Sequence, residues 1–223
     1  MPTTRKTHTP LQSDQAYHLL RQQILTFDLV PGQKISETKL TADLPYGRTP
    51  IREAILQLKS EGLLTVVPQS GTYIAKVDLQ IAEQARYARE QIEPQIMRDA
   101  LTRLTPADLD WLDNLLVEQA TDANETATFF ARDEAFHQFF YERTGHELLW
   151  RWLKDLSKQL DRFRWLRVAS QRLDWQALIA EHQAILTALR HDDADTAYRI
   201  AHTHLQHMIA DQLAVIASYP DYF

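Results

Sequence analysis

The sequence predicts a mainly α-helical protein in two parts, a small N-terminal part with a β-hairpin and a larger part that is helical throughout. Three observations support this fold class. Apolar residues recur three and four positions apart along most of the chain, which is the period of an amphipathic helix. Two short apolar runs near residues 64–75 flank a turn instead. The 223 residues include only five glycines, which disfavours a turn-rich β fold. The length suits two domains.

The N-terminal part begins with an arm and a helix. Residues 1–12 lack the apolar run of a signal peptide, and we expect a flexible arm there. Ser13 is expected to cap the first helix, whose apolar positions continue to Phe27 at helical spacing. The pair Pro31-Gly32 ends this unit.

Two further helices and a hairpin follow. Ser36 starts a short helix that Pro45 stops, and a third helix runs from near Arg48 to Gly62. The apolar runs at 64–67 and 72–75 are joined by the turn residues PQSG, which predicts a hairpin. Three helices and a hairpin in this order outline a winged helix-turn-helix.

From Asp78 onward the pattern is only helical, which predicts an all-α bundle. Thr105-Pro106 is an N-cap followed by proline at the first helical position, whereas Pro94 should kink or divide its helix. The predicted helical segments are 79–104, 106–121, 125–143, 146–167, 173–191 and 193–217. The predicted domains are therefore a winged helix-turn-helix at 13–76, a hinge at 77–78, a helical domain at 79–217 and a tail at 218–223.

Charge is divided unevenly between these parts. The net charge is −6, but residues 1–76 carry nine Lys and Arg against six Asp and Glu, and the remainder carries fifteen against twenty-four. A basic small domain on an acidic larger one can bind DNA with one end only.

The absence of cysteine means that any metal must be held by nitrogen and oxygen ligands. No run is apolar enough to cross a membrane, and we expect a cytoplasmic protein.

Residues 31–75, PGQKISETKLTADLPYGRTPIREAILQLKSEGLLTVVPQSGTYIA, resemble the DNA-binding domain of GntR-family transcription regulators. The helical remainder resembles the FCD-type ligand domain of the FadR subfamily. The motifs that carry this second resemblance are Arg89/Glu93, Asp133/His137, Glu181-His182 and His204-Leu205. The resemblance implies a regulator, expected to be a repressor and a homodimer on a pseudo-palindromic operator, and not an enzyme. Pro45-Tyr46-Gly47 replaces the serine that usually caps the recognition helix.

The third helix is predicted to read DNA. Arg48, Thr49 and Arg52 occupy its N-terminal end, which a recognition helix projects into the major groove. Arginine can pair with guanine there, and threonine can meet a phosphate or a thymine methyl. Taken alone, the two arginines could be a solvated helix face. The predicted contacts at the tip of the wing are Gln69, Ser70 and Gly71.

Asp133 and His137 are four residues apart and face the same way as the neighbouring phenylalanines. An isolated pair of this kind is most often an ion pair or a core histidine. The family pattern adds His182 and His204 from two other helices, and leaves His202 and His207 at the surface. One carboxylate and three imidazoles suit one divalent transition metal ion per chain, zinc first, with nickel, manganese or iron as alternatives.

The predicted effector is a small organic acid that completes the metal shell. Arg89 either pairs with an anionic group of this effector or forms a salt bridge to Glu93 on its own helix. The competing function is a metal-dependent hydrolase. It lacks support in the sequence, because Glu134 points about 100° away from Asp133 on a helix, and His191-Asp192 lacks the spaced partners of a phosphohydrolase.

Overall fold

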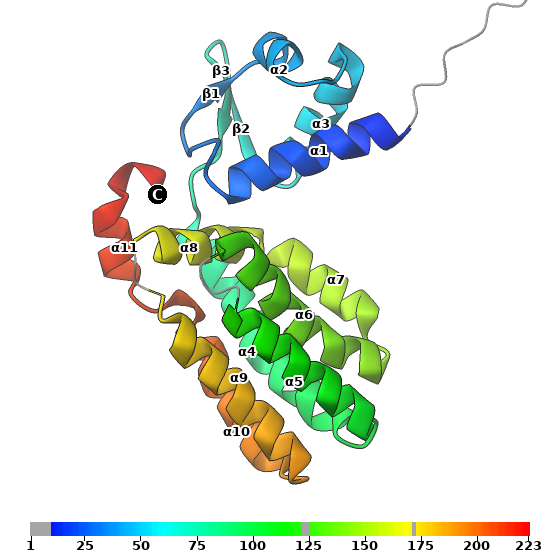
Figure 1. Cartoon of the computed structure of the whole chain (residues 1–223). Helices are drawn as coiled ribbons and strands as arrows, with labels where there is room; N and C mark the ends of the chain where they lie inside the picture. Colours follow the sequence, from blue (N-terminus) through cyan, green and yellow to red (C-terminus); the bar gives the residue numbers. More distant parts are fainter. Residues whose placement is uncertain (1–9, 122–124, 171–172) are drawn as a thin grey trace, which may run out of the picture. The chain divides into compact units, whose positions relative to one another are not determined.

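The structure, a computed structural model, describes residues 10–121, 125–170 and 173–223 (Figure 1). The described residues form two units: the chain up to Val77 together with Tyr219–Phe223, and Asp78–Ser218. The predicted class is confirmed, because helices dominate both units and the strands form one small sheet.

The first unit has the elements of a winged helix-turn-helix. Its helices are α1 (Pro10–Leu25), α2 (Glu37–Asp43) and α3 (Arg48–Ser60). Its strands β1 (Lys34–Ile35), β2 (Leu64–Val67) and β3 (Gly71–Ile74) form an antiparallel sheet in the order β1-β3-β2. The buried core joins all three helices to the sheet through Leu20, Ile24, Leu40, Ile51, Leu58, Leu64 and Ile74. Strand β1 is too short to show an apolar alternation in the sequence.

Local signals explain where the short helices begin. The Ser36 hydroxyl accepts a hydrogen bond from the Lys39 amide at 3.2 Å and caps α2, as predicted. Gly47 precedes α3 without a side-chain cap, in agreement with the missing serine. The prediction that Ser13 caps the first helix is wrong. α1 begins at Pro10, and Ser13 lies inside it and donates to Glu53 of α3.

The hairpin between β2 and β3 is the predicted wing. Val67 pairs with Gly71, so the tip is the turn that contains Gln69 and Ser70. Gln69 and Gly71 both have positive φ angles, of 61° and 139°. A β-carbon on Gly71 would lie 2.7 Å from the Lys34 side chain. The flexible end of Lys34 could move away, but the φ of 139° favours glycine, so Gly71 has a structural role in the backbone of the wing.

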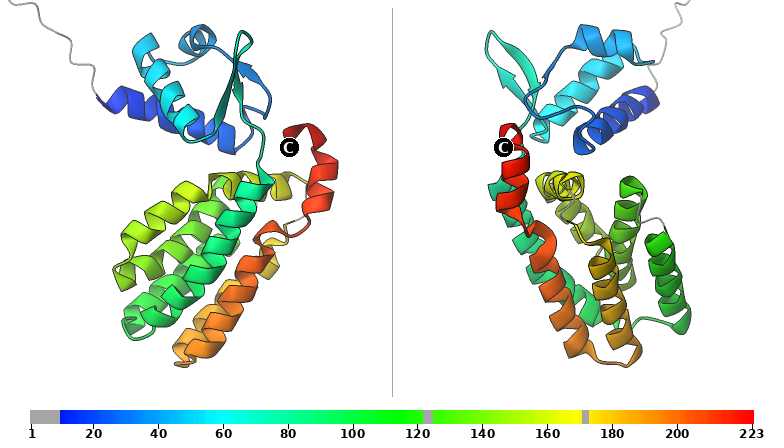
Figure 2. Two further views of the ribbon diagram at one scale, coloured as in Figure 1. Left: turned by 180° about the vertical axis from the view of Figure 1, so that it is seen from behind. Right: turned by 60° about the vertical axis from the view of Figure 1, so that its left-hand side comes forward.

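The second unit is helical throughout its described residues (Figure 2). Its helices are α4 (Leu79–Ala100), α5 (Pro106–Thr121), α6 (Thr126–Thr144), α7 (Glu147–Leu156), α8 (Lys158–Ala169), α9 (Trp175–Arg190), α10 (Ala194–Gln206) and α11 (Gln212–Ser218), with a 3₁₀ turn η1 (His207–Ile209). α4 packs against α6, α7, α8 and α10. It is therefore the central helix of the bundle.

Three predicted helical segments differ from the structure. Pro94 lies inside α4 without dividing it. The segment 146–167 is two helices, because the chain leaves helical geometry at buried Ser157 (φ −79°, ψ 0°). The segment 193–217 is α10, η1 and α11, separated at Asp211, whose φ is 63°. Apolar spacing continues across both breaks, so periodicity alone could not reveal them.

The bundle core surrounds the inward face of α6. Phe136, Phe139 and Phe140 are buried with apolar residues of α4, α5, α9 and α10. This packing forces Asp133 and His137, which lie on the same helix face, into the interior.

In the described part of the chain, no helix combines the length and the apolar character that crossing a bilayer would require.

Candidate metal centre and DNA-binding surface

The N-terminal end of α3 is open to solvent. Arg48, Thr49 and Arg52 are exposed and border a shallow surface hollow together with Glu53 and Leu56. The Arg48 side chain is 79% exposed, with the carboxylate of Glu37 3.8 Å from its Nε. The opposite face of α3 is buried in the unit core. The side chains predicted to read DNA are thus accessible from solvent, and the helix that carries them is fixed by its buried face.

The wing tip is polar and exposed. Gln69 and Ser70 are exposed, and the Ser70 hydroxyl lies 2.6 Å from the hydroxyl of Tyr73. Because the turn is held by strand pairing on both sides, its backbone is presented as a fixed loop.

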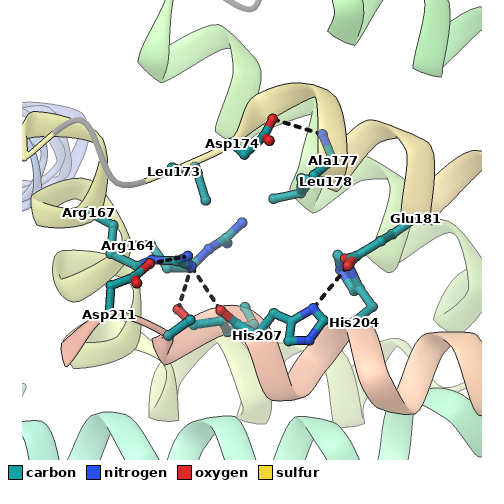
Figure 3. A pocket seen from close by; sticks show the side chains of 12 residues that line it. Arg164, Arg167, Leu173, Asp174, Ala177, Leu178, Glu181, His204, His207 and Asp211 are labelled. Carbon is teal, nitrogen blue, oxygen red and sulfur yellow. Dashed lines mark hydrogen bonds and ion pairs between the residues drawn. The ribbon is translucent and has the colours of Figure 1, made fainter.

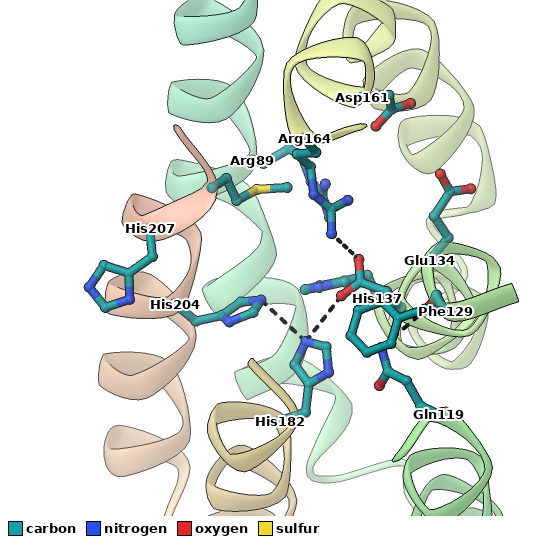
Figure 4. A network of polar contacts seen from close by, with 12 residues as sticks. Arg89, Gln119, Phe129, Glu134, His137, Asp161, Arg164, His182, His204 and His207 are labelled. Carbon is teal, nitrogen blue, oxygen red and sulfur yellow. Dashed lines mark hydrogen bonds and ion pairs between the residues drawn. The ribbon is translucent and has the colours of Figure 1, made fainter. Parts of the chain in front are cut away.

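Three imidazoles from three helices meet inside the bundle. His137 of α6, His182 of α9 and His204 of α10 each offer a ring nitrogen, and these atoms lie within 4.8 Å of one another. All three residues are buried (Figure 4). The Nε2 atoms of His182 and His204 are 3.2 Å apart. The His182 ring stacks on Phe136 with centroids 4.2 Å apart. Helix packing therefore brings together the histidines that the sequence analysis selected.

Asp133 lies at the edge of this cluster. Its Oδ1 is 3.7 Å from Nε2 of His182. Its Oδ2 accepts a hydrogen bond at 2.6 Å from Nη2 of Arg164 on α8. Asp133 is fully buried, and Oδ1 has no hydrogen-bond partner among the described residues. One oxygen is thus neutralised by arginine, and the other remains available on the side of the histidines.

Two carboxylates orient the histidine rings from outside the cluster. Glu181 Oε2 is 2.7 Å from Nδ1 of His204, so the ring turns its Nε2 towards His182. Glu93 Oε2 is 2.7 Å from Nδ1 of His137, although out of line for a hydrogen bond. Carboxylates behind histidines set the tautomer and orientation of metal-ligating rings.

Burial controls the charges in the cluster. Burial lowers the pKa of His137 and of His182 below the ordinary value, so both rings are neutral and have a free lone pair. Burial by itself raises the pKa of Asp133, but the Arg164 guanidinium outweighs burial, so the pKa lies well below its usual range. In the same way, burial raises the pKa of Glu93, but the Arg89 guanidinium outweighs burial and lowers this pKa to about 2.

These side chains fit a divalent transition metal. Neutral imidazole nitrogens and a charged carboxylate oxygen are the donors that such ions take in cysteine-free sites. Asp133 Oδ1, His137 Nε2 and His182 Nδ1 are buried without a hydrogen-bond partner in the described structure. Unpaired buried polar atoms are costly unless something satisfies them. A cation between the rings would satisfy Asp133 Oδ1 and His137 Nε2.

A cavity of about 250 Å³ opens beside the cluster (Figure 3). Its polar lining comes from α8, α9 and its N-cap, α10 and the chain after α10. The polar lining residues are Arg164, Arg167, Asp174, Glu181, His204, His207 and Asp211. Arg164 and His204 belong to both the cavity and the cluster. A molecule in the cavity would therefore lie next to the candidate metal ligands.

Arg89 has the structural role that the sequence left open as its second possibility. It is buried and forms an ion pair with Glu93, with Nη2 3.3 Å from Oε2. It is not among the described residues that line the cavity. The cavity arginines are Arg164 and Arg167, which the sequence analysis missed. α8 also contains Lys158, Asp161 and Arg162, so nothing in the sequence singled out Arg164 or Arg167.

The two remaining histidines differ from each other. His202 is half-buried, with Nε2 3.2 Å from Oε1 of Glu90, and lies outside the cluster. His207 is 57% exposed, but its Nδ1 is 2.9 Å from the same Glu181 that holds His204. His202 is therefore the cleaner comparison for tests of the centre.

The groups that a hydrolase would need are directed elsewhere. Glu134 contacts Lys154 at 2.5 Å rather than the histidines. His191 is exposed at the end of α9. Neither side chain is placed to activate a water at the cluster.

Comparison with known proteins identifies both halves of the chain. The family model "Bacterial regulatory proteins, gntR family" matches residues 12–74, and the model "FCD domain" matches residues 85–207. The chain belongs to the GntR family. It is a regulator of transcription that binds DNA, and it is not an enzyme.

Relatives of this GntR-family chain cover most of its length. It is 32% identical over 207 residues to an uncharacterized HTH-type transcriptional regulator of Streptomyces ambofaciens, covering 93% of this chain and 87% of that protein. It is 28% identical to the HTH-type transcriptional repressor RspR of Escherichia coli, covering 91% and 90%. The solved structure of E. coli McbR/YncC has the same fold, with a TM-score of 0.74 at 21% identity, covering 93% and 98% of the two chains.

Proposed function

We propose that this GntR-family regulator is a cytoplasmic, metal-dependent repressor whose operator binding responds to a small organic acid. The observation that carries the proposal is the buried group of three imidazoles and one carboxylate beside a cavity, in a chain whose other unit exposes a recognition helix. Repression is favoured because two relatives, RspR and GlaR of E. coli, are described as transcriptional repressors.

One divalent metal ion per chain would be held by Asp133, His137, His182 and His204. Zinc suits this donor set best, and nickel, manganese and iron are alternatives. The metal would act as a Lewis acid that binds a carboxylate of the effector. The surrounding residues would position the metal ligands. Glu181 and Glu93 orient the histidine rings, and Arg164 holds Asp133 in place.

The chemistry of the cavity favours an anionic effector. Arg164 and Arg167 line it from α8, and His204 gives access to the metal from α10. A dicarboxylate or hydroxy acid could place one oxygen at the metal and another group near an arginine. The volume of about 250 Å³ accommodates a small molecule. Arg164 and Arg167 replace Arg89 in this proposed role, since both line the cavity and Arg89 is not among its described lining residues.

We propose that exposed residues of the first unit contact the DNA. Arg48 and Arg52 would read base edges in the major groove, and Thr49 would contact the backbone or a thymine methyl. The wing residues Gln69, Ser70 and Gly71 would contact phosphate or the minor groove. The excess positive charge of this part of the chain is small. We therefore propose a homodimer that reads two half-sites of a pseudo-palindromic operator.

Sequencing of DNA fragments selected by the purified protein tests this proposal. Selection is carried out with metal-free protein, with zinc, and with zinc plus single organic acids. We expect one inverted repeat to be enriched, and its recovery to change with an acid only when metal is present. Enrichment that ignores both metal and acids would contradict regulation through the candidate centre. Absence of any enriched sequence would contradict specific DNA binding.

A further inference from the structure

The last residues of the chain pack with the DNA-binding unit, although they follow the final helix of the bundle. The backbone amide of Val77 donates a hydrogen bond to the carbonyl of Tyr222 at 2.7 Å. The ammonium of Lys76 donates to the carbonyl of Phe223 at 2.9 Å. The chain thus joins the two units twice, at residues 77–78 and again at 218–219.

Aromatic contacts hold the same segment in place. The Tyr222 ring stacks on Phe27, with centroids 5.7 Å apart and planes 9° apart, and on Tyr219 at 5.3 Å. Phe27 has a φ of 64°, which is unfavourable for a bulky side chain. Such a conformation persists only where surrounding contacts hold it. The ring of Tyr222 supplies one of these contacts.

The segment before the last residues forms part of the cavity wall. Met208, Ala210 and Asp211 line the cavity. Arg167 Nη1 donates to the carbonyls of His207 at 2.9 Å and Met208 at 3.3 Å. Only the seven-residue helix α11 lies between this wall and Tyr219. A molecule that displaced Arg167 or the cavity wall would therefore also displace α11, which connects the wall to Tyr219 in the DNA-binding unit.

We propose that Tyr219–Phe223 is a clasp that couples the cavity wall to the DNA-binding unit. Binding of a metal at the candidate centre then changes the stability of the clasp contacts. The connection is short, because His204 lies near the end of α10 and the next residues of the chain form the cavity wall. The coupling rests on the proposed function, because it requires a ligand that favours one state of the protein over another.

Hydrogen exchange of the full chain tests the clasp. Exchange is measured at the Val77 amide and at residues 26–29, with metal-free protein and with zinc as the only added probe. Zinc content is determined on the same samples. Tyr222→Ala removes the ring that stacks on Phe27, and a chain that ends at Ser218 removes the whole clasp. Leu213→Ala is the control, because Leu213 on α11 is 86% exposed.

We expect Val77 to exchange roughly tenfold faster in Tyr222→Ala, and faster still in the shortened chain, because local opening no longer breaks the stack. Zinc should alter exchange at Val77 in the wild type and in Leu213→Ala, but not in the other two proteins. Unchanged exchange in both clasp variants would overturn the clasp. Zinc that binds without altering Val77 in the wild type would overturn the coupling. Failure to bind zinc would contradict both the proposed metal centre and the coupling. Exchange at Val77 in Tyr222→Ala and in the shortened chain would still test the clasp itself.

Discussion

Zinc is expected to raise the melting temperature of the wild-type protein, because an ion that binds only the folded state stabilises it by mass action. At a free zinc concentration of 100 times Kd, the stabilisation is about 2.7 kcal/mol. A domain of the size of this bundle gains roughly 3–4 °C per kcal/mol, so the expected shift is about 8–11 °C.

His182→Ala should nearly abolish this shift. The Nε2 of His182 lies 3.2 Å from that of His204 and 3.7 Å from Asp133, so the ring is central to the cluster. If its loss weakens zinc binding about 100-fold, the same zinc concentration equals the new Kd and stabilises by only about 0.4 kcal/mol. The expected shift is then about 1 °C. The variant also loses the ring stacked on Phe136, so its zinc-free melting temperature should fall as well.

Differential scanning calorimetry with and without zinc, on protein prepared without affinity-column metal, measures the shift separately from the loss of packing. His202→Ala is the matched control, since His202 contacts Glu90 outside the cluster and should retain the full shift. An unmoved wild-type melting curve, or a His182→Ala protein that keeps the wild-type shift, would refute the metal centre. The cluster would then be a buried polar network.

Three further predictions concern DNA, assembly and acid stability. Arg48→Ala or Arg52→Ala should each cost about 1–3 kcal/mol in operator binding measured by gel shift, with an unchanged melting temperature. Lys59→Ala, at the far end of α3, is the control, and normal binding by either arginine variant would remove that residue from the interface. Footprinting should reveal two equivalent half-sites and sedimentation a dimer, whereas a monomer on one asymmetric site would contradict the homodimer. Burial alone raises the pKa of Asp161, but Lys154 outweighs it and the net pKa is lowered. The folded state then holds its proton less tightly than the unfolded state, so this stabilisation is present above about pH 3.9 and is lost as the pH falls further. Urea unfolding below pH 4 should therefore depend less on pH in Asp161→Asn, and an unchanged dependence would show that the carboxylate contributes nothing.

Local chemistry made the first unit predictable from sequence. Ser36, Gly47 and the turn before Gly71 act on neighbouring residues, so helix starts and the wing follow from a few positions. The exceptions have tertiary causes. Ser13 has the chemistry of a cap, but its hydroxyl meets Glu53, forty residues away, and the helix begins before it. Strand β1 exists only because β3 pairs with it.

The sequence by itself determined the mainly helical class, the two-part organisation of the motifs, and the four residues proposed as metal ligands. Spacing of four residues places Asp133 and His137 on one helix face wherever that helix packs. Only the tertiary structure decided what surrounds them. Arg164 reaches Asp133 from 31 residues away, and Glu181 orients His204 across two helices. The same holds for the last residues of the chain, whose contacts with the first unit no local pattern reports. These partners lie far apart in sequence and meet only because the helices bury their apolar faces together, so no period or motif in the chain could have revealed them.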